Sequence, residues 1–539
     1  MTKQRIHLKR IFLFIAIALV ILPWFSQKAS VGAEAENQKS PIKITPSAPV
    51  FDQQARLSEL AQRRSRVAQA IGPKGLLILF SSEPRVYAND VDYEYRQENN
   101  LYYLTMLKQN RATLVLLPGN AQHPEILFLP RRDARFEVWS GHMYSVDEAY
   151  AASGIQEIWD AREFEPFIQA IRAKRPYRPK PENIFLTSAA ENTASDFTDL
   201  YAAAEKNQAE LYLLSPGEPN TRERTREYRN ELRFVTKWEE SPTGFVVKNA
   251  APIFANLRLR KSEMELKQLQ HAIDITTEAQ ERAWSVAGDA KWEYEVHAQV
   301  DYTFKLRNAD HWGYPSIVGC GPNATTLHYV ESQGRVRPGD LILMDVGAEY
   351  DHYTADVTRT FPVSGKFTPA QADIYQIVYD AQEAGAKVIR PGAAYSDVHR
   401  AATEVIKAGL LKLGLITDPN SDQYRLWFMH GTTHFLGMNV HDVGSTARLE
   451  PGMVFTNEPG IYVRLDALEQ RPFNFKQEDW EKFKQAVGPA FERYKGIGVR
   501  IEDDMLVTET GTVWMTAALP RKLSEVEDFM AQVKRAKVN

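Results

Sequence analysis

The fold of the C-terminal half is decided by residues 341–361, which read LILMDVGAEYDHYTADVTRTF. Asp345 lies inside an apolar run, where a charge is costly unless a partner compensates it. Asp356 and the two threonines that follow it at alternate positions share one face of a second strand. If the chain folds back at Tyr350-Asp351, Asp345 and Asp356 face each other directly. Facing carboxylates repel unless they are protonated or bind cations, so we expect a metal site here. The plainer alternative is a polar turn with two solvated aspartates.

A histidine-rich segment follows at residues 428–444, which read FMHGTTHFLGMNVHDVG. Three of the 12 histidines of the chain fall in it, His430, His434 and His441. The residues between His430 and His434 are glycine and threonine, which are poor helix formers, so we expect extended or loop geometry. A neutral imidazole is the commonest protein metal ligand, and other histidines can bind substrate or move protons. The segment therefore predicts a binding site rather than structural histidines.

Two glutamates stand further along the chain. Glu458 precedes a proline in LEPGMVFTNEPGIYV, residues 449–463, and the proline favours an extended conformation for it. Glu502 lies in GIGVRIEDDMLVT, residues 496–508, where Arg500, Glu502 and Asp504 share one strand face. Each glutamate taken alone would be read as an ordinary surface carboxylate.

The composition is that of a globular protein. Of the 539 residues 44% are hydrophobic and 25% charged, and this length predicts two domains. A net charge of −4 lacks the basic excess of nucleic-acid-binding surfaces, so we expect no nucleic-acid partner. Cys320 is the one cysteine, which excludes an intramolecular disulfide. We interpret it as a small buried filler rather than a nucleophile.

The first 33 residues have the order of a secretory signal. Four basic residues among the first ten precede an apolar run from Ile11 to Phe25 and then small residues up to Ala33. The run is shorter than the roughly 20 residues of a membrane span. We interpret residues 1–33 as a signal peptide, with an uncleaved N-terminal anchor as the alternative. Either interpretation predicts an exported protein, periplasmic or extracellular.

The remainder divides into a linker and two domains. We expect a polar linker at residues 34–54 and an α/β domain at 55–250, in which short apolar strands such as 75–80 and 112–117 alternate with helices. Residues 251–539 mix helices with antiparallel strands, which predicts α+β. Ser262 and Glu265 have capping-box spacing and predict a helix that starts there. Two more helices are expected around residues 369–388 and 395–413.

The order of these motifs resembles the metal-site signature of the aminopeptidase P, prolidase and methionine aminopeptidase group. The order is Asp, a second Asp eleven residues on, a histidine-rich loop, Glu-Pro-Gly and then Arg-Ile-Glu-Asp. Upstream, NATTLHY at residues 323–329 resembles a further histidine motif and points to His328. The resemblance covers residues 257–510 and is closest to aminopeptidase P. It extends more weakly to YEYRQENNLYYLT at residues 93–105, which looks like the N-terminal domain of that subgroup.

The resemblance implies a C-terminal pita-bread domain with a dinuclear metal site. One metal would be held by Asp345, both would be bridged by Asp356 and Glu502, and the other would be completed by His434 and Glu458. Four carboxylates with one imidazole form an oxygen-rich set. Two Mn²⁺ ions fit this set best, with Zn²⁺, Co²⁺ or Fe²⁺ as alternatives.

The resemblance also implies roles for the neighbouring residues. A water or hydroxide held between the metals would be the nucleophile, with Glu458 accepting its proton. His328 and His441 would stabilise the tetrahedral intermediate or the leaving group, and His430 would line the substrate pocket. Arg500 would orient Glu502 or a neighbouring carboxylate.

The function implied by the resemblance is a metal-dependent Xaa-Pro aminopeptidase with a peptide substrate. The alternatives are a prolidase-type Xaa-Pro dipeptidase and a non-catalytic peptide-binding module that has kept the fold. A polar stretch at residues 464–494 is longer than the family pattern and would form either a lid or a surface helix. Membrane contact is expected only if the N-terminal segment stays uncleaved, and dimers or tetramers would fit the family.

Overall fold

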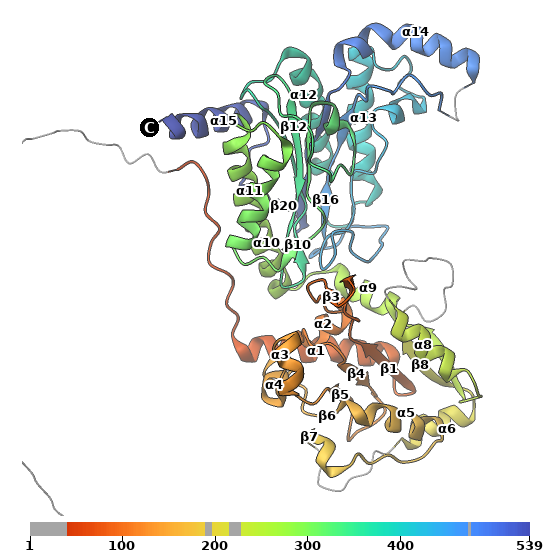
Figure 1. Ribbon diagram of the computed structural model, residues 1–539. Helices are drawn as coiled ribbons and strands as arrows, with labels where there is room; N and C mark the ends of the chain where they lie inside the picture. The colour runs from red at the N-terminus through yellow and green to blue at the C-terminus, as the bar shows by residue number, and fades with distance from the viewer. Residues whose placement is uncertain (1–39, 189–196, 215–227, 473–475, 539) are drawn as a thin grey trace, which may run out of the picture. The chain divides into compact units, whose positions relative to one another are not determined.

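The computed structural model describes residues 40–188, 197–214, 228–472 and 476–538 (Figure 1). The predicted signal at residues 1–33 lies outside the described residues. The expected linker is described from residue 40, and residues 43–50 contain neither helix nor strand. Lys43 Nζ lies 2.9 Å from Glu281 Oε1, and the Thr45 hydroxyl donates to Glu278 Oε2 at 2.6 Å. Within the described residues, no helix combines the length and the apolarity needed to cross a membrane.

The first half is built on a seven-stranded mixed sheet, in the order β7-β6-β5-β4-β1-β8-β9. Its strands are β1 (Gly75–Phe80), β4 (Thr113–Leu116), β5 (Glu125–Leu129), β6 (Ile158–Asp160), β7 (Ile184–Leu186), β8 (Ala209–Leu213) and β9 (Phe245–Asn249). Strand β1 pairs parallel with β8 and antiparallel with β4. The strands expected at residues 75–80 and 112–117 are confirmed as β1 and β4, and both are almost entirely buried.

Helices and one small hairpin complete this half. The hairpin is β2 (Val86–Ala88) with β3 (Val91–Asp92). The helices are α1 (Gln53–Ile71), α2 (Asn99–Thr105), α3 (Ala134–Ser140), α4 (Val146–Ser153), α5 (Phe164–Arg172), α6 (Thr198–Glu205) and α8 (Arg229–Trp238). Together with the mixed sheet they give the α/β architecture that the sequence predicts. Helix α9 (Ala251–Leu259) follows, at the expected start of the second domain.

The second half contains short antiparallel strands. They form the sheets β10-β13-β14, β11-β12-β15 and β16-β19-β20 and the pair β17-β18. Their bounds are β10 (His311–Trp312), β11 (Ile317–Cys320), β12 (Leu341–Val346), β13 (Ala348–Tyr350), β14 (Tyr353–Thr354), β15 (Val357–Pro362), β16 (Val454–Asn457), β17 (Gly460–Tyr462), β18 (Gly498–Arg500), β19 (Asp503–Val507) and β20 (Thr512–Trp514).

Two of the helices of this half, α10 and α12, begin at capping boxes. The helices are α10 (Glu263–Ala287), α11 (Glu293–Leu306), α12 (Pro369–Lys387), α13 (Ser396–Leu413), α14 (Gln477–Tyr494) and α15 (Leu523–Val538). Ser262 caps α10, since its side chain accepts from the Glu265 backbone and the Glu265 side chain accepts from the Ser262 backbone. The helices expected near residues 369–388 and 395–413 are confirmed as α12 and α13.

The central hairpin differs by one residue from the predicted turn. Asp345 pairs with Thr358 rather than with Asp356, because the turn lies at Asp351 and His352, which both have positive φ angles of 49° and 69°. Moving the turn by one residue shifts the register by two. The two aspartates therefore stay on the same face but as diagonal neighbours, whose separation of about 7–8 Å exceeds that of a facing pair.

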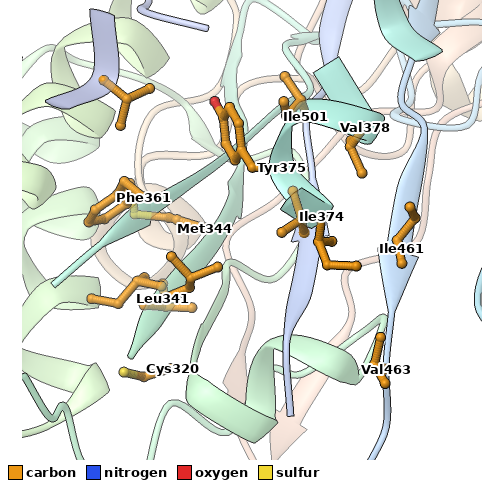
Figure 2. Packing of buried hydrophobic residues seen from close by; sticks show 14 of the residues in the cluster. Cys320, Leu341, Met344, Phe361, Ile374, Tyr375, Val378, Ile461, Val463 and Ile501 are labelled. Atoms are coloured by element: carbon orange, nitrogen blue, oxygen red, sulfur yellow. The ribbon is translucent and has the colours of Figure 1, made fainter. Parts of the chain in front are cut away.

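The core of the second half lies on the opposite face of this hairpin (Figure 2). Ile342, Met344 and Val346 point into it from β12, whereas Leu343 belongs to a small cluster on the face that carries Asp345. Cys320 lies in the same core with 3% of its surface exposed. Burial raises the pKa of its thiol to about 12, which fits a filler and not a nucleophile.

Helix α14 occupies part of the long stretch at residues 464–494. Its apolar face is buried through Trp480, Phe483 and Phe491, which belong to the core of the second half. At its end the Tyr494 hydroxyl donates to Asp373 of α12 at 2.8 Å. The apolar side chains of α14 are thus already packed against the body of the protein.

Candidate metal centre

Three carboxylates from separate strands meet in the interior. Asp345 comes from β12, Asp356 from the residues just before β15, and Glu502 from the step between β18 and β19. They are 7%, 3% and 2% exposed, respectively. The sheet register places them, since Asp345 pairs with Thr358 and the Glu502 backbone N–H donates to the Thr358 carbonyl at 3.1 Å.

Tyr314 joins two of these carboxylates and was not predicted as a site residue. Its hydroxyl lies 2.5 Å from Asp345 Oδ1 and 2.6 Å from Asp356 Oδ1. A phenol has one proton and can donate to only one of the two oxygens at a time. In the sequence Tyr314 simply precedes Pro315, so only the tertiary structure reveals its place.

His434 and Glu458 complete the cluster from two neighbouring segments. The backbone around His434 is extended beside β16, because Thr456 N–H donates to the His434 carbonyl at 3.0 Å. This confirms the extended geometry expected for the segment. His434 Nδ1 faces the Phe435 carbonyl at 3.3 Å, and Nε2 points to Asp356 Oδ2 at 3.2 Å and Glu458 Oε1 at 3.4 Å. Nε2 therefore faces the two carboxylates, on the side where a cation bound among them would be ligated.

The electrostatics of the cluster are those of crowded buried acids. Burial, reinforced by the charges of Asp356 and Glu458, raises the pKa of Glu502 well above its usual range. Burial likewise raises the pKa of Glu458 to about 7, although His434 opposes the shift. Burial opposes protonation of His434, yet its bond to Asp356 and the charge of Glu458 raise its pKa to about 9. The protein alone does not neutralise these acids.

The donor set fits divalent cations. One ligand atom each from Asp356, His434 and Glu502 lie within 4.8 Å of one another. Asp504 lies on the same strand face as Glu502, and its Oδ1 is buried without a hydrogen-bond partner. Carboxylate oxygens with one imidazole suit hard or borderline divalent metals, whose charge would compensate the repulsion between the acids.

Arg500 supports the cluster from one side. Its Nη2 donates to Asp345 Oδ2 at 2.5 Å and its Nε donates to Thr358 Oγ1 at 3.0 Å. The Thr358 hydroxyl in turn donates to Glu502 Oε2 at 2.6 Å. Arg500 therefore contacts Asp345 directly and reaches Glu502 through Thr358.

His430 lies at the end of the same network. Arg500 Nη1 donates to the Tyr462 hydroxyl at 2.8 Å, which lies 2.9 Å from His430 Nε2. His430 Nδ1 lies 2.6 Å from the Gly431 carbonyl, so both ring nitrogens have protein partners. Burial and the charge of Arg500 lower the pKa of His430 to about 3, which keeps the ring neutral.

His441 and His328 lie on the exposed side of the site. The His441 ring is 4.4 Å from the His434 ring in an edge-to-face arrangement, and both His441 and His328 are exposed. Partial burial of the His441 ring, followed by the charges of His434 and His328, lowers the pKa of His441. The structure thus gathers the predicted residues around one centre, with the acids inside and two histidines toward solvent.

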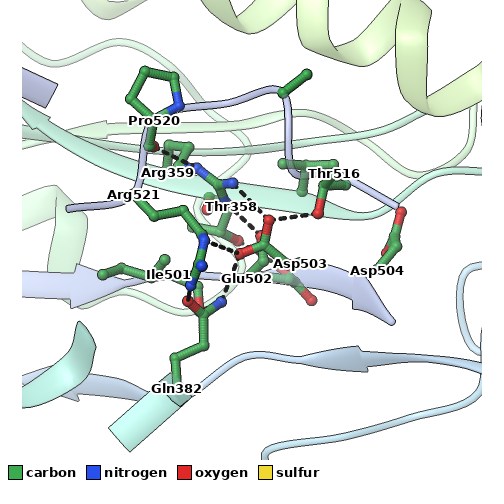
Figure 3. Close-up of polar contacts among 12 residues, drawn as sticks. Thr358, Arg359, Gln382, Ile501, Glu502, Asp503, Asp504, Thr516, Pro520 and Arg521 are labelled. Atoms are coloured by element: carbon green, nitrogen blue, oxygen red, sulfur yellow. Dashed lines mark hydrogen bonds and ion pairs between the residues drawn. The ribbon is translucent and has the colours of Figure 1, made fainter. Parts of the chain in front are cut away.

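A second polar network holds the strand that carries Glu502 from behind (Figure 3). Arg359 is fully buried and donates to the Glu502 carbonyl and to Asp503 Oδ1, both at 2.6 Å. Gln382 of α12 donates to Asp503 Oδ2 at 2.8 Å. Asp503 faces away from the site, so these bonds fix the backbone and leave the Glu502 carboxylate for the site.

Comparison with known proteins agrees with this geometry. Residues 267–509 match the model of metallopeptidase family M24, and residues 60–178 match that of the aminopeptidase P N-terminal domain. The Xaa-Pro aminopeptidase of Haemophilus influenzae is 31% identical over 88% of this chain and 97% of its own length. Xaa-Pro aminopeptidase 1 of Streptomyces coelicolor is 33% identical over 89% of this chain and 88% of its own length.

Solved structures of aminopeptidases are also similar to this protein. The Pseudomonas aeruginosa aminopeptidase PepP has a TM-score of 0.68 and 30% identity, over 89% of this chain and 99% of its own. A zinc-substituted Escherichia coli aminopeptidase P in complex with product has a TM-score of 0.68 and 29% identity, over 90% of this chain and 99% of its own. The chain therefore belongs to metallopeptidase family M24, with an aminopeptidase P N-terminal domain and a C-terminal pita-bread domain.

Proposed function

We propose that this protein is an Xaa-Pro aminopeptidase, a metal-dependent hydrolase that releases the N-terminal residue from peptides with proline in second position. The observation that carries the proposal is the convergence of Asp345, Asp356, His434, Glu458 and Glu502 on one buried centre. The relatives with this name align along almost their whole length with the chain. A non-catalytic binding module is not favoured, because it would not need five metal-binding side chains gathered in the interior.

We propose these same five residues as the ligands of two divalent metals, and Mn²⁺ as the native ion because oxygen donors dominate the set. Bound there, the metals would polarise the scissile carbonyl and lower the pKa of a water. Tyr314, Arg500 and Thr358 would hold the ligands in place, since each contacts a ligand carboxylate directly.

The residues around the ligands either transfer protons and donate hydrogen bonds or line the substrate pocket. We assign Glu458 as the group that accepts the proton of that water, because its carboxylate lies inside the cluster, 3.4 Å from His434 Nε2. His441 and His328 lie on the open side, where a peptide would enter, and would donate hydrogen bonds to the tetrahedral intermediate or the leaving amine. His430 has both nitrogens occupied by protein partners, so we assign it to the wall of the substrate pocket.

Cleavage assays with two substrates test the proposed function. Metal-free protein, with and without added Mn²⁺, would be offered a Gly-Pro dipeptide and a longer Xaa-Pro peptide. We expect metal-dependent release of the first residue from the longer peptide. Preference for the dipeptide would establish a prolidase-type dipeptidase instead, and cleavage of neither by metal-loaded protein would contradict both.

Further proposals concern the N-terminal segment, helix α14, the domain boundary and the oligomeric state. The basic start and short apolar run support export through a cleaved signal at residues 1–33, with membrane attachment only if cleavage fails. The burial of its apolar face supports α14 as a surface helix rather than a lid. We place the domain boundary near residue 250, just before α9, and expect a homo-oligomer. N-terminal sequencing of secreted protein and its mass in solution test these points.

A further inference from the structure

The segment around α2 contacts the loop that carries His441, in the second half of the chain. It belongs to the stretch at residues 93–105, and none of its residues has a part in the proposed chemistry. Arg96 Nε lies 2.9 Å from both carboxylate oxygens of Glu349 on β13. Two more side chains of the segment, Asn99 and Asn100, are 8% and 5% exposed. Buried polar groups of this kind are retained where they have specific partners.

The first partners of the segment lie in the loop that carries His441, at Met438 and Asn439. Arg96 Nη2 donates to the Met438 carbonyl at 2.7 Å, and Arg96 Nη1 donates to Asn99 Oδ1 at 2.9 Å. Asn99 Nδ2 then donates to Asn439 Oδ1 at 2.9 Å. Two neighbouring side chains therefore hold two consecutive residues of the loop.

The second partner is Asp442, the residue after His441. Asn100 Oδ1 accepts from Arg258 Nη1 at 2.9 Å, and Arg258 Nη2 donates to Asp442 Oδ1 at 2.5 Å. The side chains of Arg258 and Asp442 are 3% and 1% exposed. Lys261 Nζ also lies 3.8 Å from Asp442 Oδ2, so two buried cations face this carboxylate. Breaking an ion pair this deeply buried is costly, because a charge loses its partner.

Few backbone hydrogen bonds hold the loop, although the Met438 side chain is buried and the Thr354 N–H donates to the Gly437 carbonyl at 2.8 Å. Residues 437–444 contain neither helix nor strand. Within this stretch the Gly437 N–H donates to the Asn439 carbonyl at 3.2 Å, and the Asp442 N–H donates to the Phe435 carbonyl at 2.8 Å. Segments with so few backbone bonds open easily unless side chains from elsewhere hold them.

We propose that Arg96, Asn99, Asn100 and Arg258 are positioning residues for His441. They clamp the loop on both sides of the histidine, at Met438–Asn439 and at Asp442, and so let the N-terminal half contribute to turnover without touching the substrate. The inference rests on the proposed function insofar as it assigns His441 to the transition state. The effect of these residues on the order of the loop can be measured by hydrogen exchange, without an assay of activity.

The test compares two variants of contacts that join the same two halves of the chain. Arg96→Lys keeps the charge but cannot reach Glu349, Asn99 and Met438 together. The matched control is Asp310→Asn, which breaks the ion pair of Asp310 with Lys108, 3.0 Å apart, and does not touch the loop. Both would be measured for kcat and KM on an Xaa-Pro peptide, for bound metal, and for amide hydrogen exchange in residues 437–442.

We expect Arg96→Lys to lower kcat by about tenfold to a hundredfold, because a displacement of about 1 Å in a catalytic group has an effect of this size. KM and metal content should stay near wild type, while exchange in the loop accelerates. Asp310→Asn should match wild type in kcat, KM, bound metal and hydrogen exchange of the loop. Asn99→Ala, a smaller change, should repeat the pattern more weakly.

Two results would overturn the inference. One is an Arg96→Lys protein whose kcat and loop exchange match those of Asp310→Asn. The other is a lower melting temperature in Arg96→Lys with an unchanged kcat per folded molecule, which would show a purely structural role. If wild-type protein cleaves no Xaa-Pro peptide, the proposed function fails, and the exchange comparison still decides whether the clamp orders the loop.

Discussion

The two sides of the metal site are built in different ways. Asp345, Asp356 and Glu502 are buried, lie on or beside paired strands, and have short bonds to Tyr314, Arg500 and Thr358. His328 and His441 are exposed and lie outside helices and sheets. We infer from this difference that sheet register would position the proposed metal ligands, whereas turnover would depend on loops that need support from elsewhere. We call the part formed by Asp345, Asp356 and Glu502 the acid side, and the part formed by His328 and His441 the histidine side. Substitutions on the acid side should remove the metals, and substitutions on the histidine side should leave the metals bound.

The largest effect is expected from Asp356→Ala, which breaks the acid side. Asp356 contacts both Tyr314 and His434. Its loss therefore removes a proposed bridging ligand and also the carboxylate partner of His434, another proposed ligand. Metal content should fall below one ion per chain, and kcat/KM should drop by at least about a thousandfold. Elemental analysis and peptide cleavage check this. Asp373→Asn, which removes a carboxylate of α12 outside the site, serves as the control. A folded Asp356→Ala protein with full activity would refute the dinuclear model.

His441→Ala tests the other side. We expect kcat to fall by about a hundredfold, the size of effect seen when one stabilising donor is lost, with both metals retained. His434→Ala should lose metal instead, although the two rings are only 4.4 Å apart. His142→Ala changes an exposed histidine of the first half and should have no effect. If His441→Ala lost its metals as His434→Ala does, the division between the two sides would be wrong.

Tyr314→Phe sharpens the comparison within the acid side. The variant keeps every proposed ligand but removes the hydroxyl that contacts Asp345 and Asp356. Loss of such an outer contact commonly weakens metal affinity by about 10- to 100-fold. Competition with a chromogenic chelator measures the affinity, with Tyr150→Phe as an exposed control. Unchanged affinity would mean that the backbone alone positions the two aspartates.

The smallest effect concerns His352 in the hairpin turn. Its ring stacks on Tyr102 at 3.8 Å, and burial followed by the charges of Arg96, Lys108 and Arg258 lowers its pKa well below the usual value. Below about pH 6.5 the unfolded chain gains a proton that the folded chain cannot bind. The folded state should therefore lose up to about 1.4 kcal/mol for each pH unit of acidification below 6.5.

Urea unfolding at several pH values measures this loss. His352→Asn keeps a residue type that tolerates the positive φ angle and removes the titrating ring. Its stability should depend less steeply on pH between 6.5 and 5 than that of wild type. Equal slopes for the two proteins would show that His352 does not contribute to the acid sensitivity.

The sequence predicts the faces of the strands better than their register. Alternation in residues 341–361 places Asp345, Asp356 and Thr358 on one face, as the structure has them. The turn is one residue later because Asp351 and His352 adopt positive φ angles, which a sequence pattern without a Gly at the turn does not indicate. The helix start predicted from Ser262 and Glu265 is confirmed, because a capping box is a local signal.

Contacts between distant segments could not be predicted in the same way. Tyr314 approaches the aspartates only once β11 is paired with β12, and the resemblance left the partner of Arg500 open between Glu502 and a neighbour. The bonds from Arg96 and Asn99 to residues 438 and 439 span more than 300 positions of the chain. No periodicity or spacing encodes such a contact, because it depends on how complete domains pack.

Because Cys320 is buried, the native protein should react only slowly with thiol reagents. With a pKa near 12 and 3% exposure, its sulfur presents almost no thiolate to solvent at neutral pH. A cysteine introduced on the loop at residues 437–442 would therefore accept a fluorescent probe at a single position without removal of the natural thiol. Conversely, slow modification of Cys320 in unaltered protein would report how often the core of the second half opens.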